Sequence, residues 1–214
     1  RWRIWNASSA RYLNLSLSGH KFTLVGTDGG LLEKPVRDLQ QILLSPAERM
    51  EIIVDTLGQS GAINLQIEPY NRGKMSHVAV EKTTKIATIN MQAGSSLSIP
   101  DFLRKIDALG ATKSIKKLIF TEIMSMANGH HSMEFLINGK SFDMNQIDFI
   151  SRVYEVELWE ISNQSDMDHP FHVHGTQFQV VETERNNVRT VTPYRAWKDT
   201  VNVRAGETVC IKIR

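Results

Sequence analysis

The stretch from Asp168 to Gly175, which reads Asp-His-Pro-Phe-His-Val-His-Gly, constrains this chain more than any other part of it. Its three histidines fall within six consecutive positions. In an extended strand, side chains at positions i and i+2 point to the same face, so His172 and His174 are expected to project together. Pro170 lacks an N–H and disturbs strand pairing, so His169 can point to a separate place.

We interpret this arrangement as two metal positions, with His169 at one and the pair at the other. Neutral imidazole binds copper, zinc, iron and nickel, so the spacing alone does not choose the metal. A histidine-rich surface turn without metal is the alternative. Phe171 and Val173 alternate with the pair and are expected to pack into an apolar core.

Composition limits the class of protein. The chain has 214 residues, enough for one large domain or two small ones, and its 41% hydrophobic and 22% charged content is typical of globular proteins. It has no apolar run of about 18 residues and therefore no predicted membrane span. The net charge of +2 is too small to indicate a nucleic-acid partner, and the single cysteine, Cys210, excludes an internal disulfide. Without an initiator Met or a signal peptide, the chain is interpreted as the middle of a longer protein.

Sequence periodicity predicts β-strands. Apolar and polar residues alternate over Leu13–Leu17 and Ile63–Ile67, and turn residues such as Gly26–Gly30 separate such segments. Ser45–Glu48 could cap a helix, but Met50–Val54 is short and rich in β-branched residues, so we expect a turn into a strand there. Short strands at regular spacing favour a β-sandwich.

One segment is predicted to be helical. Between Asp101 and Gly110, the apolar residues at positions 102, 103, 106 and 109 share one helical face, and Gly110 can end the helix. We interpret it as part of an interdomain connector.

The segment from Met124 to Met133 contains three methionines and two histidines. Thioether and imidazole groups suit Cu(I), so a metal-binding segment is one interpretation. We favour the other, a loop whose methionines belong to the core.

The histidine stretch resembles the third copper-binding motif of the multicopper oxidases, the family of laccases, bilirubin oxidases and cuprous oxidases. The likeness covers nearly the whole chain in order, and bacterial laccase-like and cuprous-oxidase-like members match it best. Four other segments carry it: Gly26–Leu32, Leu44–Arg49, Ile137–Asn145 and Trp197–Val201. Ala47 stands where the family's Pro-Gly-Glu-Arg turn has glycine.

The resemblance implies an all-β fold of two cupredoxin-like Greek-key β-sandwich domains, both incomplete, joined by a linker with a short helix. Residues 1–84 are expected to form part of the copper-free middle domain. Residues 85–116 would be the linker, and residues 117–214 the C-terminal cupredoxin domain, which ends before the family's His-Cys-His motif.

The resemblance also implies roles for the histidines. His169 would be a ligand of the type 1 copper, His172 of the type 2 copper and His174 of one of the type 3 pair. The trinuclear cluster also needs two His-x-His pairs from an N-terminal domain outside this chain. Cys210 lacks the flanking histidines of the blue-copper motif, so we expect a packing or surface thiol there.

The implied activity is that of a copper-dependent oxidase. Such an enzyme takes single electrons from a reducing substrate, phenols or metal ions such as Cu(I), at the type 1 copper and reduces O2 to water at the trinuclear cluster. Because most ligands of the cluster lie elsewhere, we expect this chain to be inactive alone. Family habit places such a protein outside the cytoplasm of a bacterium.

A substrate site is expected just before the histidines. Met167 matches a position that binds substrate Cu(I) in cuprous-oxidase relatives, and Asp166 and Asp168 flank it. An ordinary acidic loop is the alternative. Asp166, Asp168 and Gln177 are also candidates for fixing the imidazole tautomers.

Two other functions compete with the oxidase. A non-enzymatic structural or cell-division protein of the same fold is the main alternative, although the retained histidines argue against it. A zinc or iron site on an unrelated β-sandwich would leave the matching flanks unexplained.

Overall fold

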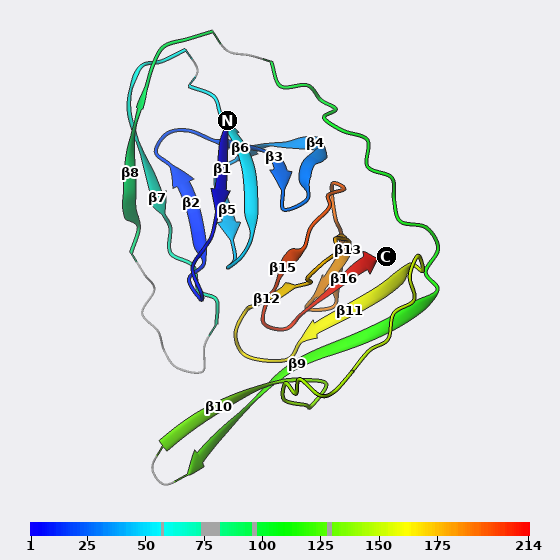
Figure 1. The fold of residues 1–214 in the computed structure, drawn as a ribbon. Coiled ribbons are helices and arrows are strands. Elements are labelled where there is room, and N and C mark those ends of the chain that lie inside the picture. The colour runs from blue at the N-terminus through cyan, green and yellow to red at the C-terminus, as the bar shows by residue number, and fades with distance from the viewer. Residues whose placement is uncertain (57, 74–81, 96–97, 128–129) are drawn as a thin grey trace.

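The structure of the protein is a computed structural model, and it describes residues 1–56, 58–73, 82–95, 98–127 and 130–214. Every regular element in these residues is a β-strand, which confirms the predicted all-β fold. Within the same residues, no helix has the length and apolar character needed to cross a membrane. The strands form two sandwiches that lie against each other (Figure 1).

The first sandwich contains two four-stranded sheets with the orders β1-β6-β3-β4 and β5-β2-β7-β8. The strands are β1 (Trp2–Trp5), β2 (Leu13–Leu17), β3 (Phe22–Thr27), β4 (Gly30–Leu39), β5 (Gln41–Leu44), β6 (Arg49–Val54), β7 (Gly61–Ile67) and β8 (Thr84–Met91). Between the sheets lies a core that includes Leu15, Phe22 and Ile52, none of them more than 1% exposed. The strand predicted at Met50–Val54 is confirmed as part of β6.

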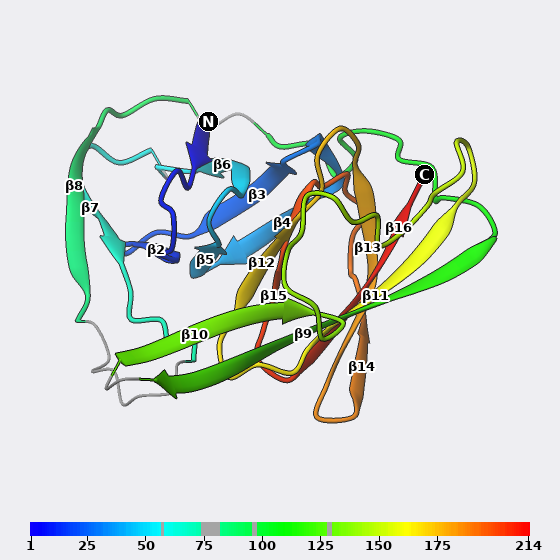
Figure 2. The same cartoon turned by 60° about the horizontal axis from the view of Figure 1, so that its bottom comes forward.

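The second sandwich contains a six-stranded sheet with the order β10-β9-β11-β16-β13-β14 and a two-stranded sheet of β12 and β15. The strands are β9 (Ser114–Ala127), β10 (His130–Ile137), β11 (Glu157–Asn163), β12 (His169–His172), β13 (Phe178–Arg185), β14 (Val188–Val191), β15 (Thr200–Val203) and β16 (Glu207–Ile213). Phe171 and Val173 pack against the core between the two sheets, as the alternation predicted. In Figure 2, β12 and β15 lie on the side of this sandwich that faces the first.

The predicted helix at residues 101–110 is wrong, because this segment is an extended connection along both sandwiches (Figure 1). Its backbone hydrogen bonds go to other elements and not to its own next turn. The Leu103 N–H donates to the Glu33 carbonyl at 2.9 Å, and Gln179 Nε2 donates to the Asp107 carbonyl at 2.8 Å. Ile106 is 2% exposed, so the apolar side chains anchor a connecting segment. The expected start of the linker at residue 85 lies inside β8.

The segment 124–133 is not a loop with core methionines. Its described residues, 124–127 and 130–133, belong to the antiparallel β9–β10 hairpin, in which Met124 lies opposite Met133. Met124, Met126 and Met133 are 46%, 70% and 40% exposed. The long strands extend beyond the rest of the second sandwich, so the methionines lie on a surface hairpin (Figure 1).

Candidate metal centre

Strand β12 carries the histidines and is fixed by its pairing with β15. In the antiparallel register, His169 lies opposite Val203 and His172 opposite Thr200. The chain then turns at Gly175, whose φ of 79° is a conformation that glycine adopts without steric cost. His174 lies in this turn, just beyond the end of the strand.

The structure brings His172 and His174 together. Their ring centroids are 4.8 Å apart, and both rings line an open pocket of about 430 Å³ whose wall includes Gln177 and Asp199. His169 lines a different pocket of about 480 Å³, mostly apolar, with Phe120 and Phe135. The separation of one imidazole from a pair is therefore present in the geometry.

One tautomer is fixed at His172. The Nδ1 atom lies 2.9 Å from the backbone carbonyl oxygen of Asp199, which can only accept a hydrogen bond, so Nδ1 carries the proton and donates. Thr200 Oγ1 lies 3.0 Å from the same nitrogen and itself donates to Asp199 Oδ1 at 2.9 Å. The Nε2 atom of His172 therefore keeps its lone pair, as a metal ligand needs.

The opposite tautomer is fixed at His169. Its Nε2 atom lies 2.8 Å from Ser165 Oγ. The Ser165 hydroxyl has one proton, and its other two close partners, Asn163 Oδ1 at 2.7 Å and the Met167 carbonyl at 3.0 Å, are both acceptors. His169 Nε2 therefore donates, and Nδ1 keeps the lone pair. Burial, with the Arg72 charge, lowers the pKa of His169 and favours the neutral ring.

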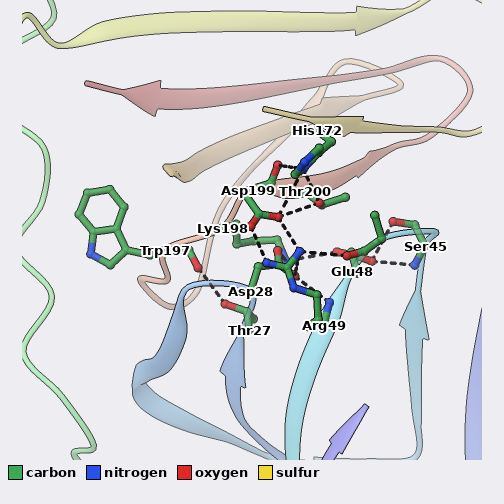
Figure 3. A network of polar contacts seen from close by, with 11 residues as sticks. Thr27, Asp28, Ser45, Glu48, Arg49, His172, Trp197, Lys198, Asp199 and Thr200 are labelled. Atoms are coloured by element: carbon green, nitrogen blue, oxygen red, sulfur yellow. Dashed lines mark hydrogen bonds and ion pairs between the residues drawn. The ribbon is translucent and has the colours of Figure 1, made fainter. Parts of the chain in front are cut away.

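The first sandwich reaches the His172 end of β12 through Arg49 (Figure 3). Arg49 Nη1 donates to Asp199 Oδ1 at 2.7 Å, and Nη2 donates to Asp199 Oδ2. Burial acts to raise the pKa of Asp199, but the hydrogen bonds from Arg49 and Thr200 outweigh it and hold the pKa below its usual value. Asp199 is thus an ionised carboxylate beside the His172 ring.

A buried cluster of one lysine and two carboxylates lies next to this contact. Lys198 Nζ lies 3.1 Å from Asp28 Oδ2 and 3.2 Å from Glu48 Oε1, and all three side chains are at most 11% exposed. Burial acts to lower the pKa of Lys198, but the two carboxylates raise it above its usual value. Gly29 allows this approach, because a Cβ there would collide with the backbone of Trp197.

The first sandwich also reaches the His169 end. Tyr70 donates to Asp168 Oδ2 at 2.5 Å, and the same carboxylate accepts from Asn202 Nδ2 at 3.0 Å and from the Ala205 N–H at 3.1 Å. The Asp168 N–H donates to the carbonyl of Arg72 at 2.6 Å. Asp168 is 5% exposed, so its carboxylate is turned away from solvent. Its hydrogen bonds hold the chain in place before β12.

The expected substrate residues differ in exposure. Met167 is 8% exposed, and its sulfur accepts a hydrogen bond from Arg72 Nη2 at 3.3 Å. Asp166 is exposed, and its N–H donates to Glu122 Oε1 at 2.9 Å. Desolvation and the neighbouring Glu122 carboxylate raise the pKa of Asp166. Of the three residues, Asp166 alone faces solvent.

The hydrogen-bond partners of the His169 and His172 rings were not predicted from the sequence. Asp166, Asp168 and Gln177 were expected to fix the tautomers, but the hydrogen bonds of the two rings go to Ser165 and to Asp199 with Thr200. A signal was present for Asp199 and Thr200, because both belong to the Trp197–Val201 segment that resembles the family. No comparable signal marked Ser165.

Cys210 lies on β16 with its neighbours Val209 and Ile211 turned into the core. Its own partners across the sheet are Glu160 and Glu182. Burial and these two carboxylates raise the pKa of the thiol to about 11, so the protonated thiol is favoured. Among the residues that the structure describes, no three His, Cys, Asp or Glu side chains form a metal-binding group.

Known proteins resemble this chain over nearly all of its length. Two family models, both described as multicopper oxidase, match residues 1–95 and 118–214. The chain is 34% identical to the multicopper oxidase mco of Staphylococcus epidermidis over all of its own length and 41% of that protein. It superposes with a TM-score of 0.91 and 37% identity on a Campylobacter jejuni multicopper oxidase described as a metallo-oxidase, covering 99% of this chain and 47% of that one.

The chain belongs to the multicopper oxidase family, and its two sandwiches are cupredoxin-like. The family's cofactor is copper, and the donor set of the site fits it, because His172 Nε2 and His169 Nδ1 are neutral nitrogen lone pairs. The chain is also 30% identical to the cell division protein FtsP of Photorhabdus laumondii. That match covers 94% of this chain and 41% of FtsP. The chain thus spans less than half the length of each of these relatives.

Proposed function

We propose that this chain is part of a copper-dependent oxidase that takes electrons from a reducing substrate and reduces O2. His169 would bind the type 1 copper, which accepts electrons, and His172 and His174 would bind the type 2 and type 3 coppers, where O2 is reduced. The observation that supports this most is the separation of a half-buried single imidazole, His169, from an open pair, His172 at the end of β12 and His174 in the turn beyond it. The two positions lie on one strand, so its backbone links the two copper sites.

Copper, when bound, supplies one-electron redox chemistry. The residues of the chain would prepare the ligands for it. Ser165 and the Asp199 carbonyl hold the two rings in opposite tautomers, so that His169 presents Nδ1 and His172 presents Nε2. The rings of Phe120 and Phe135 lie nearly perpendicular to the His169 ring at centroid distances of 6.0 and 5.5 Å, and the buried Phe120 would shield one side of that ligand from water.

The rest of the ligand set would come from outside this chain. Two His-x-His pairs and a His-Cys-His segment would complete the copper sites, so we propose that the chain alone is inactive. The partners are then O2, a small reducing substrate and the remaining parts of the same protein. The proposed location is outside the cytoplasm of a bacterium.

For the substrate, we propose metal ions such as Cu(I), with phenols as the alternative. Asp166 is exposed beside Glu122, so the pair offers carboxylates to a cation a few residues before His169. Met167 lies behind it as a soft sulfur. Asp166→Asn and Met167→Leu in the full-length enzyme are expected to slow Cu(I) oxidation more than phenol oxidation. If the substitutions slow both reactions equally, or slow neither, a metal-ion site is contradicted.

The likeness to the FtsP protein is the basis of a second candidate, a non-enzymatic cell-division protein of the same fold. The two candidates differ in whether copper binds. The test is copper content and the visible spectrum of the full-length protein after copper loading, with O2 consumption measured alongside. We expect bound copper and an intense blue absorption band, whereas a protein without either would favour the non-enzymatic function.

A further inference from the structure

Arg49 lies in the sandwich that carries none of the proposed ligands, yet its side chain ends on Asp199, which contacts the proposed ligand His172 (Figure 3). It meets Asp199 with two parallel hydrogen bonds from a planar fork. Such a bidentate pair fixes the orientation of a carboxylate as well as its position. A lysine could supply the charge but not the fork.

Arg49 is itself held in place before it reaches Asp199. Its backbone N–H donates to Asp28 Oδ1 at 2.7 Å. Its Nη1 donates to the Ala47 carbonyl at 3.0 Å and lies 3.7 Å from the same Asp28 oxygen. The Asp28 side chain is 0% exposed. The guanidinium is therefore fixed by groups of the first sandwich.

Asp199 passes this orientation to the ring of His172. Its carbonyl accepts from Nδ1 at 2.9 Å, and its Oδ1 lies 3.4 Å from the same nitrogen. The negative carboxylate favours a proton on Nδ1, which leaves the lone pair on Nε2. If the fork were lost, the carboxylate could rotate away from Nδ1. The Asp199 carbonyl would then be the remaining acceptor for the Nδ1 proton, and the preference for this tautomer would weaken.

We propose that Arg49 is a positioning residue for His172, acting across the interface through Asp199. The inference rests on the proposed function only in taking His172 as a copper ligand. The copper-free sandwich then helps to decide which nitrogen of a ligand in its neighbour is presented to the metal.

The test uses the metal-free, full-length protein with ¹⁵N-labelled histidine, so it does not depend on copper or on activity. Long-range ¹H–¹⁵N correlation spectra distinguish the two tautomers, and His172→Gln identifies the signal. We expect a single Nδ1–H tautomer in the unsubstituted protein and a mixture in Arg49→Met. Arg49→Lys keeps a cation near the buried Asp28, so it provides a second variant if Arg49→Met does not fold.

Arg195→Met is the matched control, because Arg195 also crosses the interface to a carboxylate, Glu33, at 3.4 Å, and its other hydrogen bond goes to the Ile106 carbonyl and not to Asp199. The Arg195→Met protein should show the same single His172 tautomer as the unsubstituted protein. A single Nδ1–H tautomer in both Arg49 variants, or equal changes in Arg195→Met, would overturn the proposal.

Copper affinity gives a second readout, in competition with a chelator. Loss of a partner that orients a ligand typically lowers metal affinity on the order of 10-fold or more, and we expect this for Arg49→Met but not for Arg195→Met. If the unsubstituted protein binds no copper, the proposed function fails, while the tautomer result still decides the role of Arg49.

Discussion

The two ends of strand β12 are both held by the first sandwich but with different chemistry. At the His169 end the contact is a buried carboxylate, Asp168, that accepts from neutral donors, and the ring lies among aromatic side chains. At the His172 end the contact is an ion pair of Arg49 and Asp199, and the ring lines an open pocket. The first arrangement suits a shielded ligand and the second an accessible one.

The difference shows how one short strand can present two kinds of ligand. Only two residues separate His169 from His172, and the same strand pair, β12 with β15, carries both. Their partners, Ser165 and Asp199, impose opposite tautomers. The tautomer of each ligand is therefore set by a group outside the strand, the Ser165 hydroxyl for His169 and the Asp199 carbonyl for His172.

The largest effect is expected at Asp168. Asp168→Ala would leave the Tyr70 hydroxyl, the Asn202 amide and the Ala205 N–H without their acceptor in a buried place. Unpaired buried donors cost about 1–3 kcal/mol each, so we expect the free energy of unfolding to fall by about 3 kcal/mol or more. Urea unfolding measures this. Asp101→Ala, which removes an exposed carboxylate, should leave stability unchanged, and equal losses would contradict a special role for Asp168.

An intermediate effect is expected at Ser165. Ser165→Ala would remove the partner of His169 Nε2, and we expect a loss of about 1–2 kcal/mol in urea unfolding. The His169 signal should then show both tautomers while that of His172 stays single. Ser162→Ala is the control, because the Ser162 hydroxyl pairs with Thr208 and not with a ring. A change of tautomer at both histidines would show that the two ends are not independent.

A small gain is expected at Ala47. Its φ of 70° is unfavourable for any residue with a Cβ, and it lies at the third position of the Ser45–Glu48 turn, where a type II turn favours glycine. Ala47→Gly should stabilise the protein by about 1 kcal/mol in thermal unfolding. Ala62→Gly, in a strand, should instead destabilise it by about 0.5 kcal/mol, and a loss of stability in both variants would contradict strain at Ala47.

Local patterns predicted much of the fold. Alternation over Leu13–Leu17 and Ile63–Ile67 identified strands, because a half-buried strand needs that period. The segment 101–110 was misassigned, because its apolar spacing fits a helix and its actual hydrogen-bond partners, Glu33 and Gln179, are far away in sequence. Periodicity carries no information about such partners.

The candidate site was only partly predictable. The spacing of the histidines predicted the pairing of His172 with His174, because strand geometry is local. The role of Arg49 was not predictable, although both segments in contact, Leu44–Arg49 and Trp197–Val201, were recognised as resembling the family. Their meeting depends on how the two sandwiches dock, and that contact joins residues 150 positions apart.

The ligand roles of His169 and His172 are tested by an anomalous difference map at the copper edge from crystals of the copper-loaded, full-length protein. We predict one copper at bonding distance from Nδ1 of His169 and another at bonding distance from Nε2 of His172. No copper at these rings, or copper bound at the opposite nitrogens, would contradict this prediction.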